Sequence, residues 1–331
     1  MAFRWIDGFD YYSTTIPATL RYTQVAATLN YGTAGRFGGL CMKLTTGGAI
    51  AASIGAATST VTVGFAFQEN VLPGATAGFF AFRNSTTTIC TLAVSATGVL
   101  HFFRGTTAGT QLDTNAAVSI AAGTWAYIEM VFTRNATTGA IAVYVNGNLL
   151  FSLTNQNTGA SDIDNLELFA PVTGGNFGLF DDFYVTDTAV RVGERRIETL
   201  RPSSDSAVTW TPNAGANNWS RVSEAQMDGD TTYVSTNTAA NEDLYGIGSL
   251  ASAPNTIDVV QTVLCARKDD AATHTLKSAL KSNATTSYGA TNGVGSSYGI
   301  AVDLFPTDPN GGGSWSASAV NAAKIGENLV S

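Results

Sequence analysis

The sequence predicts an all-β fold made of two sandwich-like domains. Three observations carry this prediction: short runs in which apolar and polar residues alternate, an abundance of small and turn-forming residues, and few amphipathic helical patterns. Of the 331 residues, 44% are hydrophobic, only 13% are charged, and 34 are glycine. A chain of this length and composition can bury a core in each of two domains. Because parallel sheets need crossover helices that this sequence lacks, antiparallel β-sandwiches are expected.

The first half of the sequence contains the clearest single strands. In residues 59–68, two valines and two phenylalanines alternate with small or polar neighbours. This period of two is typical of a strand that is buried on one face. Residues 98–104 and 163–169 follow the same pattern, and a further strand is expected over 177–187.

The stretch 123–153 predicts three consecutive antiparallel strands. The first runs from about Trp125 to Thr133, and AIAVYV forms the second. Asn146-Gly147 then predicts a type I′ hairpin turn, because both residues tolerate positive φ. The third strand follows this turn.

The second half predicts further short strands and one helix. The strands are expected at 206–211, 231–236, 256–267, 273–281 and 296–305. Ser314 is expected to cap a short helix over WSASAVNAA, and KIGENLVS is expected to form a closing strand.

The domain boundary is predicted after the strand at 177–187. The sequence RVGERRIETLRPSSD begins there, and its proline and the Ser-Ser-Asp that follows favour a turn. The predicted division is a first domain over residues 1–190, a linker or boundary strand over 191–206 and a second domain over 207–331.

The charge balance excludes one large class of partners. Residues 1–190 carry 7 basic and 11 acidic side chains, and residues 191–331 carry 10 and 14, so each part has a net charge of −4. Neither has the basic excess that binding to a phosphate backbone requires, so nucleic acid is not an expected partner. No apolar run is long enough to span a membrane, and MAFRWIDGFDYY has no features of a secretory leader.

Two short motifs match catalytic or nucleotide-binding signatures but lie in the wrong context. Residues 295–299 match G-x-S-x-G with Ser297 at the centre, yet the flanks resemble strands and no histidine follows. Residues 246–251 match a loose dinucleotide fingerprint, but Pro254 follows where a helix should begin. Both segments are expected to be turns.

Acid–base catalysis finds little support in the sequence. His101 and His274 lie in different predicted domains, and each is expected to be a strand residue with a satisfied hydrogen bond. Sandwich-fold glycosidases carry paired carboxylates, as in E-x-D-x-x-E, and no such string occurs. Glu167 is alone on its strand, and the adjacent Asp181 and Asp182 would point to opposite faces. The prediction is a protein that is not an enzyme, with no catalytic residues.

Four aspartates are the candidates for a metal site. Asp7 and Asp10 lie near the start of the chain, and Asp181 and Asp182 lie in the last predicted strand of the first domain. If these two strands are neighbours, carboxylates and carbonyls could supply the roughly six to eight oxygens that calcium requires. The alternative is that these aspartates cap turns or lie on the surface. No other cofactor is expected.

Two sets of residues are candidates for binding partners. Four of the 17 basic residues gather near the domain boundary, where they could anchor the protein to an acidic neighbour: Arg191, Arg195, Arg196 and Arg201. Several aromatic residues are candidates for a surface that stacks on sugars or docks a partner, although core or rim packing is the more frequent role. These are Tyr11, Tyr12, Trp219, Tyr233, Tyr245, Tyr288 and Tyr298.

The first domain also carries motifs that point to a known superfamily. Trp125 opens one strand, VYVNG ends the next at residues 143–147, and FDDFYV occupies 180–185. Together these features resemble the concanavalin A-like lectin/glucanase superfamily in its laminin-G-like variants, over roughly residues 1–190. The resemblance implies a jelly-roll sandwich whose lectin members bind sugar at loops on the concave face, often beside calcium. No sugar-binding motif of that superfamily is matched here, so ligand-binding residues are not assigned.

A second set of motifs spans nearly the whole chain. It consists of DGFDYY (7–12), FDDFYVTD (180–187), GERRIETLRP (193–202), WTP (210–212), DGDTTYV (228–234) and DLY (243–245). The set is similar to a family of bacteriophage virion proteins in which a lectin-like domain precedes a second β domain. This resemblance implies a concanavalin A-like jelly-roll sandwich, a smaller second β-sandwich, and a structural or adhesive role on a tailed phage particle.

The resulting hypothesis is a virion structural protein of the tail or tail fibre, assembled in the host cytoplasm. Virion appendages are symmetric, so a homo-oligomer such as a trimer is expected, with other virion proteins as partners. The second domain would serve oligomerisation or attachment to the particle. The alternatives are a capsid-decorating or head-fibre protein, an adhesin that binds a glycan of the host surface, and an enzyme that degrades polysaccharide. Insertion into a membrane is not expected.

Overall fold

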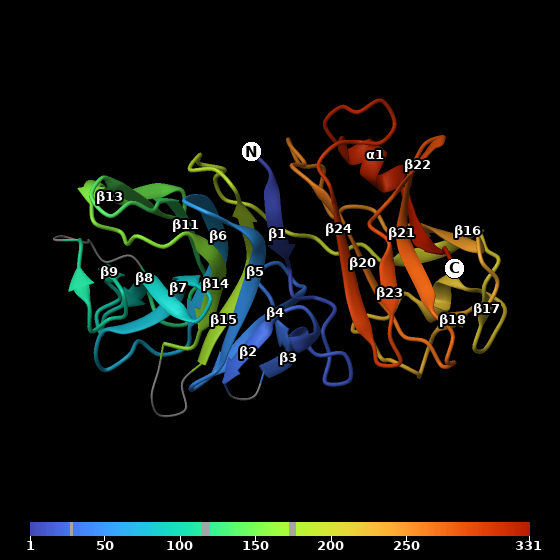
Figure 1. The fold of residues 1–331 in the computed structure, drawn as a ribbon, viewed down its shortest axis with the longest axis horizontal. Coiled ribbons are helices and arrows are strands. Elements are labelled where there is room, and N and C mark those ends of the chain that lie inside the picture. Colours follow the sequence, from blue (N-terminus) through green and yellow to red (C-terminus); the bar gives the residue numbers. More distant parts are fainter. Residues whose placement is uncertain (27–28, 114–119, 172–176) are drawn as a thin grey trace. The chain divides into compact units, whose positions relative to one another are not determined.

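The computed structural model describes residues 1–26, 29–113, 120–171 and 177–331. Contacts within the chain divide it into two units (Figure 1). Unit 1 comprises residues 1–10 and 21–197, and unit 2 comprises residues 11–20 and 198–331.

Residues 11–20, here called the strap, differ from the predicted domain division. The sequence placed them in the first domain, whereas their contacts in the structure belong to unit 2. The backbone nitrogen of Met227 donates to the carbonyl of Tyr11 at 3.0 Å, and the Ser13 hydroxyl donates to the carbonyl of Met227 at 2.6 Å. Because these contacts join residues more than 200 positions apart, local composition carries no signal of them.

Unit 1 is a sandwich of two antiparallel sheets. In order of pairing, the described strands of the first sheet are β13 (Asn148–Gln156), β12 (Gly139–Val145), β11 (Ala126–Thr133), β6 (Thr60–Glu69), β15 (Phe177–Thr186), β4 (Leu40–Thr45) and β3 (Leu29–Ala34), with β1 (Phe3–Asp7) beside β15. Those of the second sheet are β10 (Thr110–Gln111), β9 (Leu100–Arg104), β8 (Thr87–Val94), β7 (Ala77–Asn84), β14 (Ile163–Phe169), β5 (Ala49–Thr58) and β2 (Thr23–Ala26). The strap, which belongs to unit 2, contains a short 3₁₀ turn, Ala18–Leu20. Consecutive strands from β4 to β7 alternate between the sheets, as in a jelly roll.

Aromatic side chains fill the space between the two sheets of unit 1. The rings of Phe82 and Phe132 stack with centroids 4.2 Å apart, and those of Phe67 and Phe79 stack at 4.3 Å. Each of these pairs joins a strand of the second sheet to a strand of the first, and all four side chains are fully buried. Truncating one such ring to alanine costs about 3–5 kcal/mol, so this layer is a principal source of stability.

The predicted three-strand pattern at 123–153 is present as β11, β12 and β13. Asn146 has a φ of 49° and Gly147 a φ of 79°, as the predicted type I′ turn requires. The side-chain oxygen of Asn146 also accepts from the backbone nitrogen of Tyr127 at 2.8 Å, which ties the turn to the start of β11.

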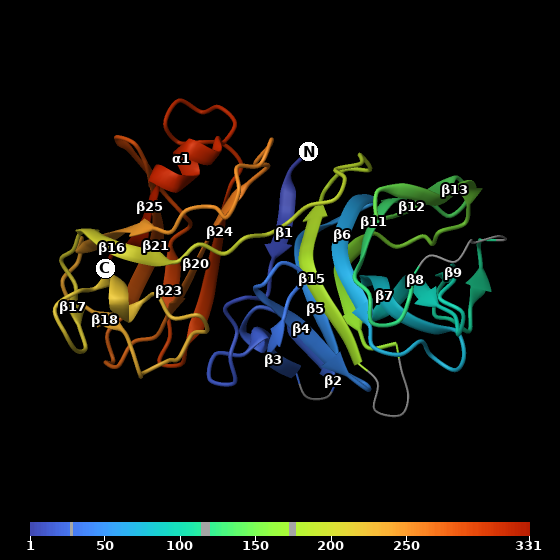
Figure 2. The same cartoon turned by 180° about the vertical axis from the view of Figure 1, so that it is seen from behind.

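The first and last strands of unit 1 are neighbours, which is the condition that the calcium hypothesis required. β1 pairs with β15 in antiparallel register, with Asp7 opposite Phe183 (Figure 2). The register of β15 against β6 shifts between Asp181 and Tyr184, and Asp182 has a φ of 52°. This bulge changes the simple alternation that placed the two adjacent aspartates on opposite faces.

Unit 2 is also built mainly of strands. In order of pairing, its largest described sheet contains β16 (Pro202–Ala207), β19 (Glu242–Ile247), β25 (Lys324–Leu329), β21 (His274–Ser282) and β22 (Thr285–Tyr288), with β23 (Asn292–Val294) beside β21. β20 (Val260–Ala266) pairs with β24 (Gly299–Phe305), and β17 (Thr211–Pro212) pairs with β18 (Val234–Ser235). A 3₁₀ turn, Trp219–Arg221, and the helix α1 (Ala317–Ala322) complete the unit. Within the described ranges, none of the helices has the length and apolar character needed to cross a membrane.

The predicted helix is present but begins later than expected. Ser316, rather than Ser314, is the N-cap, because its side chain accepts from the backbone nitrogen of Ala319 at 3.1 Å. Trp315 instead precedes the helix and enters a core with Phe305 and Val320. Its indole nitrogen donates to the carbonyl of Phe305 at 2.8 Å. Burial of this tryptophan sets where the helix begins.

The predicted closing strand lies in the interior of a sheet. β25 pairs with β19 on one side and with β21 on the other. β19 was not predicted as a strand, although its DLY residues belong to the second set of motifs. The last strand in the sequence is therefore required to complete this sheet.

A buried polar centre lies between β19 and β25. The Tyr245 hydroxyl is 2.8 Å from Asp243 Oδ2 and 2.7 Å from Glu327 Oε1. One hydroxyl proton cannot serve both contacts, so a carboxyl group must supply the second. Asp243 already accepts from the backbone nitrogens of Thr209 and Trp210 and from the side-chain nitrogen of Asn218, so its oxygens face donors. Glu327 therefore carries the proton, in agreement with burial, which raises the pKa of Glu327 to about 8.

This geometry predicts a pH dependence of stability. Because the folded state holds a proton on Glu327 up to a pH of about 8 and the unfolded state releases it near its ordinary pKa of 4.5, the stability associated with Glu327 falls as pH rises between these values. Glu327→Gln keeps a neutral side chain of similar shape. We expect the free energy of unfolding of this variant to decline less steeply between about pH 5 and pH 8 than that of the parent.

Chemical denaturation followed by tryptophan fluorescence at a series of pH values measures this difference. Asp269→Asn, which removes a carboxylate from the surface of the same unit, is the matched control and should keep the parent slope. An unchanged slope in Glu327→Gln would contradict the assignment of the proton.

Candidate functional site

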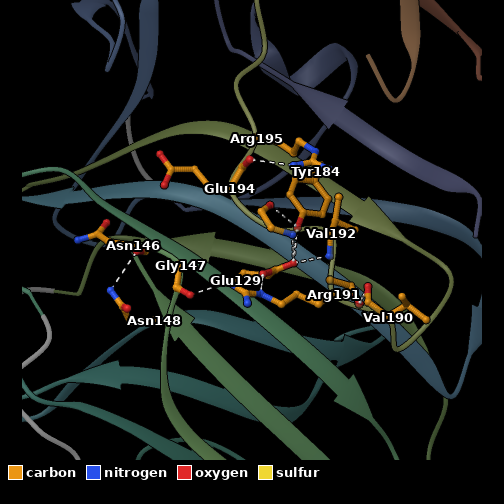
Figure 3. Close-up of polar contacts among 12 residues, drawn as sticks. Glu129, Asn146, Gly147, Asn148, Tyr184, Val190, Arg191, Val192, Glu194 and Arg195 are labelled. Carbon is orange, nitrogen blue, oxygen red and sulfur yellow. Dashed lines mark hydrogen bonds and ion pairs between the residues drawn. The ribbon is translucent and has the colours of Figure 1, made fainter. Parts of the chain in front are cut away.

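One buried carboxylate organises the outer face of the first sheet of unit 1. Glu129 lies on β11, and its neighbours Ile128 and Met130 point into the core, so Glu129 points outward. It is nevertheless only 2% exposed. The segment after β15 crosses this face and covers it (Figure 3).

Glu129 accepts hydrogen bonds from four groups. Its Oε1 accepts from the backbone nitrogens of Val192 and Gly193, at 2.6 and 2.7 Å, and from the Tyr184 hydroxyl at 3.0 Å. Its Oε2 accepts from Nε of Arg191 at 3.2 Å. Figure 3 shows these contacts converging on one side chain. We call this arrangement the Glu129 clamp.

Residues beside the clamp extend the coverage of this face. The Thr62 hydroxyl donates to the carbonyl of Thr188 at 2.7 Å, and the backbone nitrogen of Ile197 donates to Asp182 Oδ1 at 2.7 Å. Gly64 provides room for the Tyr184 ring, because a Cβ at that position would lie 2.2 Å from a ring carbon. The outer face of the first sheet is therefore closed by the chain itself at these positions.

Three of the four predicted calcium ligands come close to one another. Asp10 Oδ1 accepts from the backbone nitrogen of Leu40 at 2.6 Å, and Asp181 Oδ2 accepts from that of Arg36 at 2.7 Å. Burial and the neighbouring Asp182 raise the pKa of Asp181 to about 7, and burial raises that of Asp182 to about 6. The Arg36 guanidinium is 3.6 Å from Asp182 and supplies positive charge to the group.

Asp7 is engaged separately from this group. Its carboxylate accepts from Arg21 Nη1 and from the Tyr22 hydroxyl, each at 2.9 Å, and from the backbone nitrogen of Phe9 at 2.8 Å. In the part of the chain that the structure describes, no group of three or more His, Cys, Asp or Glu side chains is arranged to hold a metal ion. Several carboxylate oxygens of the predicted set accept from N–H or O–H donors, and Arg21 and Arg36 lie beside Asp7 and Asp182, so calcium binding by these four aspartates stays a prediction.

The four predicted partner-binding arginines make contacts within their own units. Arg191 Nη2 donates to the carbonyl of Gly147 at 2.6 Å, and its guanidinium lies 4.1 Å from the centroid of the Tyr144 ring. Arg196 lies over the Phe37 ring at 4.9 Å, and Arg195 donates to the carbonyl of Glu194 at 3.1 Å.

Arg201, the fourth, belongs to unit 2. It donates to the carbonyls of Glu224 at 3.1 Å and Ala225 at 2.9 Å. Arg191 and Arg201 thus hold nearby backbone segments in place. Binding of a partner by these two arginines would be a role in addition to these contacts.

The predicted aromatic set is divided by burial. Tyr12 and Tyr245 are fully buried, and Tyr11 is 8% exposed, so these three belong to cores. Tyr233 and Tyr288 are 41% and 46% exposed. Trp219 and Tyr298 are intermediate.

The outer face of the second sheet carries polar pairs that the sequence analysis did not assign. Arg83 on β7 forms an ion pair with Glu167 on β14 at 2.7 Å. On β9, Nδ1 of His101 lies 2.9 Å from Asp113 Oδ2, which confirms the predicted satisfied hydrogen bond of this histidine. Gln111 lies within 3.1 Å of the same ring nitrogen. Burial raises the pKa of Glu167, and the ion pair with Arg83 opposes this rise.

Aromatic rings lie on the same face as these pairs. Phe102 enters the core, so its neighbours His101 and Phe103 point to the other face of the sheet. The rings of His101 and Phe103 are arranged edge to face, with their centroids 6.4 Å apart. A Cβ at Gly78 would meet Thr91 and Phe169 within 3.0 Å, which places the half-buried Phe169 ring over this glycine. We call the set Arg83, Thr91, His101, Phe103, Glu167 and Phe169 the second-sheet face. Thr91, Phe103 and Glu167 are only 3%, 7% and 8% exposed, so Arg83, His101 and Phe169, which are half-buried, form its solvent-accessible part. In the sequence, the only indication of this face was the alternation of its strands. Alternation indicates which residues point away from the core, but it does not indicate a ligand.

Comparison with known proteins yields only distant structural similarity. No protein-family model matches the chain, and no curated protein matches it. Among solved structures, the chain is similar to a cellulose-induced protein, Cip1, with 15% identity and a TM-score of 0.46 over 58% of this chain and 100% of that one. It is also similar to the carbohydrate-binding module CBM66 from Bacillus subtilis, with 13% identity and a TM-score of 0.34 over 49% and 93%. A third is the CBM40 module of Ruminococcus gnavus IT-sialidase, with 13% identity and a TM-score of 0.32 over 41% and 80%. Since these TM-scores lie below 0.5, the fold assignment rests on the strand order of the chain itself.

The Glu129 clamp leads to a prediction about stability. Glu129→Ala leaves the backbone N–H groups of Val192 and Gly193 without their acceptor and leaves the Tyr184 hydroxyl with only the Gly193 carbonyl at 3.3 Å, so we expect the free energy of unfolding to fall by about 3 kcal/mol or more. Arg191→Ala removes an ion pair with Glu129, a hydrogen bond to the carbonyl of Gly147 and a contact with the Tyr144 ring. Because this side chain is 44% exposed, we expect a smaller loss of about 1 kcal/mol. Denaturant unfolding of both variants measures the difference. Equal losses would show that the ion pair, rather than the bonds to the backbone, dominates the clamp.

Proposed function

We propose that the chain is a non-enzymatic adhesive component of a bacteriophage virion and that unit 1 binds a glycan on the second-sheet face. The observation that carries the glycan proposal is that half-buried Arg83, His101 and Phe169 present polar groups and an aromatic ring on this face, with Arg83 held by the buried Glu167. Sugars present hydroxyl groups that bridge charged pairs and C–H faces that pack on aromatic rings. The outer face of the first sheet is less suited, because the segment at 188–197 covers it.

The polar groups of the second-sheet face are held in place before any ligand binds. Glu167 is fixed by Arg83, and His101 is fixed by Asp113, whose other oxygen accepts from the backbone nitrogen of Phe102 at 2.7 Å. Side chains fixed in this way lose little entropy on binding, which supports affinity from few contacts.

Substitution of residues on this face tests the proposal. We expect the intact protein to bind at least one polysaccharide of the host surface on a glycan array. Arg83→Ala and Phe169→Ala should each weaken this binding about tenfold or more, which corresponds to about 1.4 kcal/mol. Thr154→Ala, at an exposed position of β13 in the first sheet, should bind as the parent does. Binding that is equal in all four proteins would place the glycan elsewhere.

The virion role follows from the motif set that spans nearly the whole chain. In this proposal, the chain assembles as a homo-oligomer in the tail or tail fibre, and the basic segment that holds Arg195 and Arg196 faces an acidic neighbour. Immunogold labelling of intact particles with an antibody to the chain tests its position. Label at the tail is expected, label over the head would favour a capsid-decorating protein, and no label on any particle would overturn the virion role. In the last case, release of reducing ends from host polysaccharide would test the enzyme alternative.

Charge reversal tests the proposed contact with a neighbour. Arg196→Glu is the suitable variant, because Arg191 belongs to the Glu129 clamp and Arg201 fixes the backbone of unit 2. We expect Arg196→Glu to reduce incorporation of the chain into particles severalfold, whereas Lys277→Glu, on β21, should not. Normal incorporation of both variants, measured on purified particles, would exclude this contact.

A further inference from the structure

Unit 2 contains an open groove that the proposed function does not use. It has a volume of about 490 Å³ and is lined by residues of the strap, of the turn before β18 and of the loops that flank β20 and β24. These residues are Thr15, Pro17, Leu20, Asp230, Arg267, Ser296, Ser297 and Tyr298. All of them belong to unit 2.

Asp230 connects two sides of the groove. Its Oδ1 accepts from Nε of Arg267 at 2.9 Å and from the Tyr298 hydroxyl at 2.6 Å. The Nη2 atom of Arg267 lies at 2.9 Å from the same oxygen, and the guanidinium is 5.6 Å from the centroid of the Tyr298 ring. Three groups from distant parts of the sequence are thus held in one fixed arrangement.

The backbone supports this arrangement. The backbone nitrogen of Lys268 donates to the carbonyl of Gly295 at 2.8 Å, which joins the segment after β20 to the turn before β24. Gly229 has a φ of 68°, and a Cβ there would lie 2.9 Å from the Thr15 side chain. The turn that carries Asp230 can therefore lie against the strap because residue 229 has no side chain.

The chemistry of the groove suits a neutral polyhydroxyl ligand. The side chain of Asp230 is 61% exposed and that of Arg267 is 32% exposed, so the ion pair presents acceptors and donors to solvent side by side. Neighbouring hydroxyl groups of a sugar ring can bridge such a pair, and the Tyr298 ring offers an apolar surface for its C–H groups. Because Asp230 neutralises Arg267, the groove does not favour phosphate or sulfate, whose recognition relies on unpaired cations.

The geometry of the groove favours a binding role over a catalytic role for the G-x-S-x-G segment at residues 295–299. Ser297 is exposed and lies in a bend before β24, not in the strand-to-helix turn that a nucleophile requires. The histidine of unit 2, His274, contacts Asp270 at 3.0 Å and is absent from the groove lining. The segment therefore supplies hydroxyl groups and the Tyr298 ring to a binding surface.

We propose that this groove is a saccharide-binding site of unit 2, separate from the second-sheet face of unit 1, with the Asp230–Arg267 pair and Tyr298 as its recognition elements. Two sites on one chain increase avidity for a polymeric glycan when both are engaged. The proposal is independent of the glycan site in unit 1, since the two sites share no residue.

Nuclear magnetic resonance of the full chain tests the proposal. The Nε–H resonance of Arg267 reports on the groove, and the probes are glucose, galactose and N-acetylglucosamine, with inorganic sulfate as the anionic comparison. We expect a saturable shift of this resonance with at least one neutral sugar at millimolar concentration, and none with sulfate. Tyr298→Ala should weaken binding about tenfold or more, and Tyr298→Phe, which keeps the ring, should weaken it less.

The controls separate this site from other effects. Tyr288→Ala removes another tyrosine of unit 2 whose hydroxyl also bonds to a carboxylate, that of Glu242 at 2.7 Å, and it should leave the titration unchanged. Arg83→Ala, in unit 1, should also leave it unchanged. The proposal is overturned if no neutral sugar gives a saturable shift, if sulfate alone does, or if Tyr298→Ala binds as the parent does.

Discussion

The structure of unit 1 depends on the need of the buried Glu129 carboxylate for hydrogen-bond donors. A carboxylate that is 2% exposed is stable only when polar groups replace the water it has lost. The backbone nitrogens of Val192 and Gly193 supply two of these groups, so the segment after β15 must cross the outer face of the first sheet. This requirement fixes the path by which the chain leaves unit 1, and it closes a face that would otherwise be open to ligands.

The same arrangement recurs at other acidic residues of this chain. Asp181 and Asp182 in unit 1, and Asp205 and Asp303 in unit 2, all accept from backbone N–H groups of distant segments. A protein with only 13% charged residues thus uses several of its carboxylates to hold loops against sheets. The aspartates that suggested a calcium site are among the acidic side chains engaged in this way.

The two surfaces proposed for saccharide binding share one kind of chemistry. The second-sheet face and the groove of unit 2 each combine an arginine–carboxylate pair with aromatic rings. In both places the carboxylate compensates the charge of the arginine. This is the chemistry on which both saccharide proposals rest.

The sequence by itself determined the all-β class, the three-strand pattern at 123–153 and the type I′ turn at Asn146-Gly147, because alternation and turn chemistry are local properties. Only the tertiary structure decided that residues 11–20 belong to unit 2, that Ser316 caps the helix, and that Asp7 binds Arg21 apart from Asp10 and Asp181. These outcomes depend on hydrogen bonds and burial between segments far apart in the chain, and a bulge at Asp182 altered the expected alternation. Local sequence patterns do not encode such contacts, because the hydrogen-bond partner of each carboxylate or indole lies on a segment that only the tertiary fold places beside it.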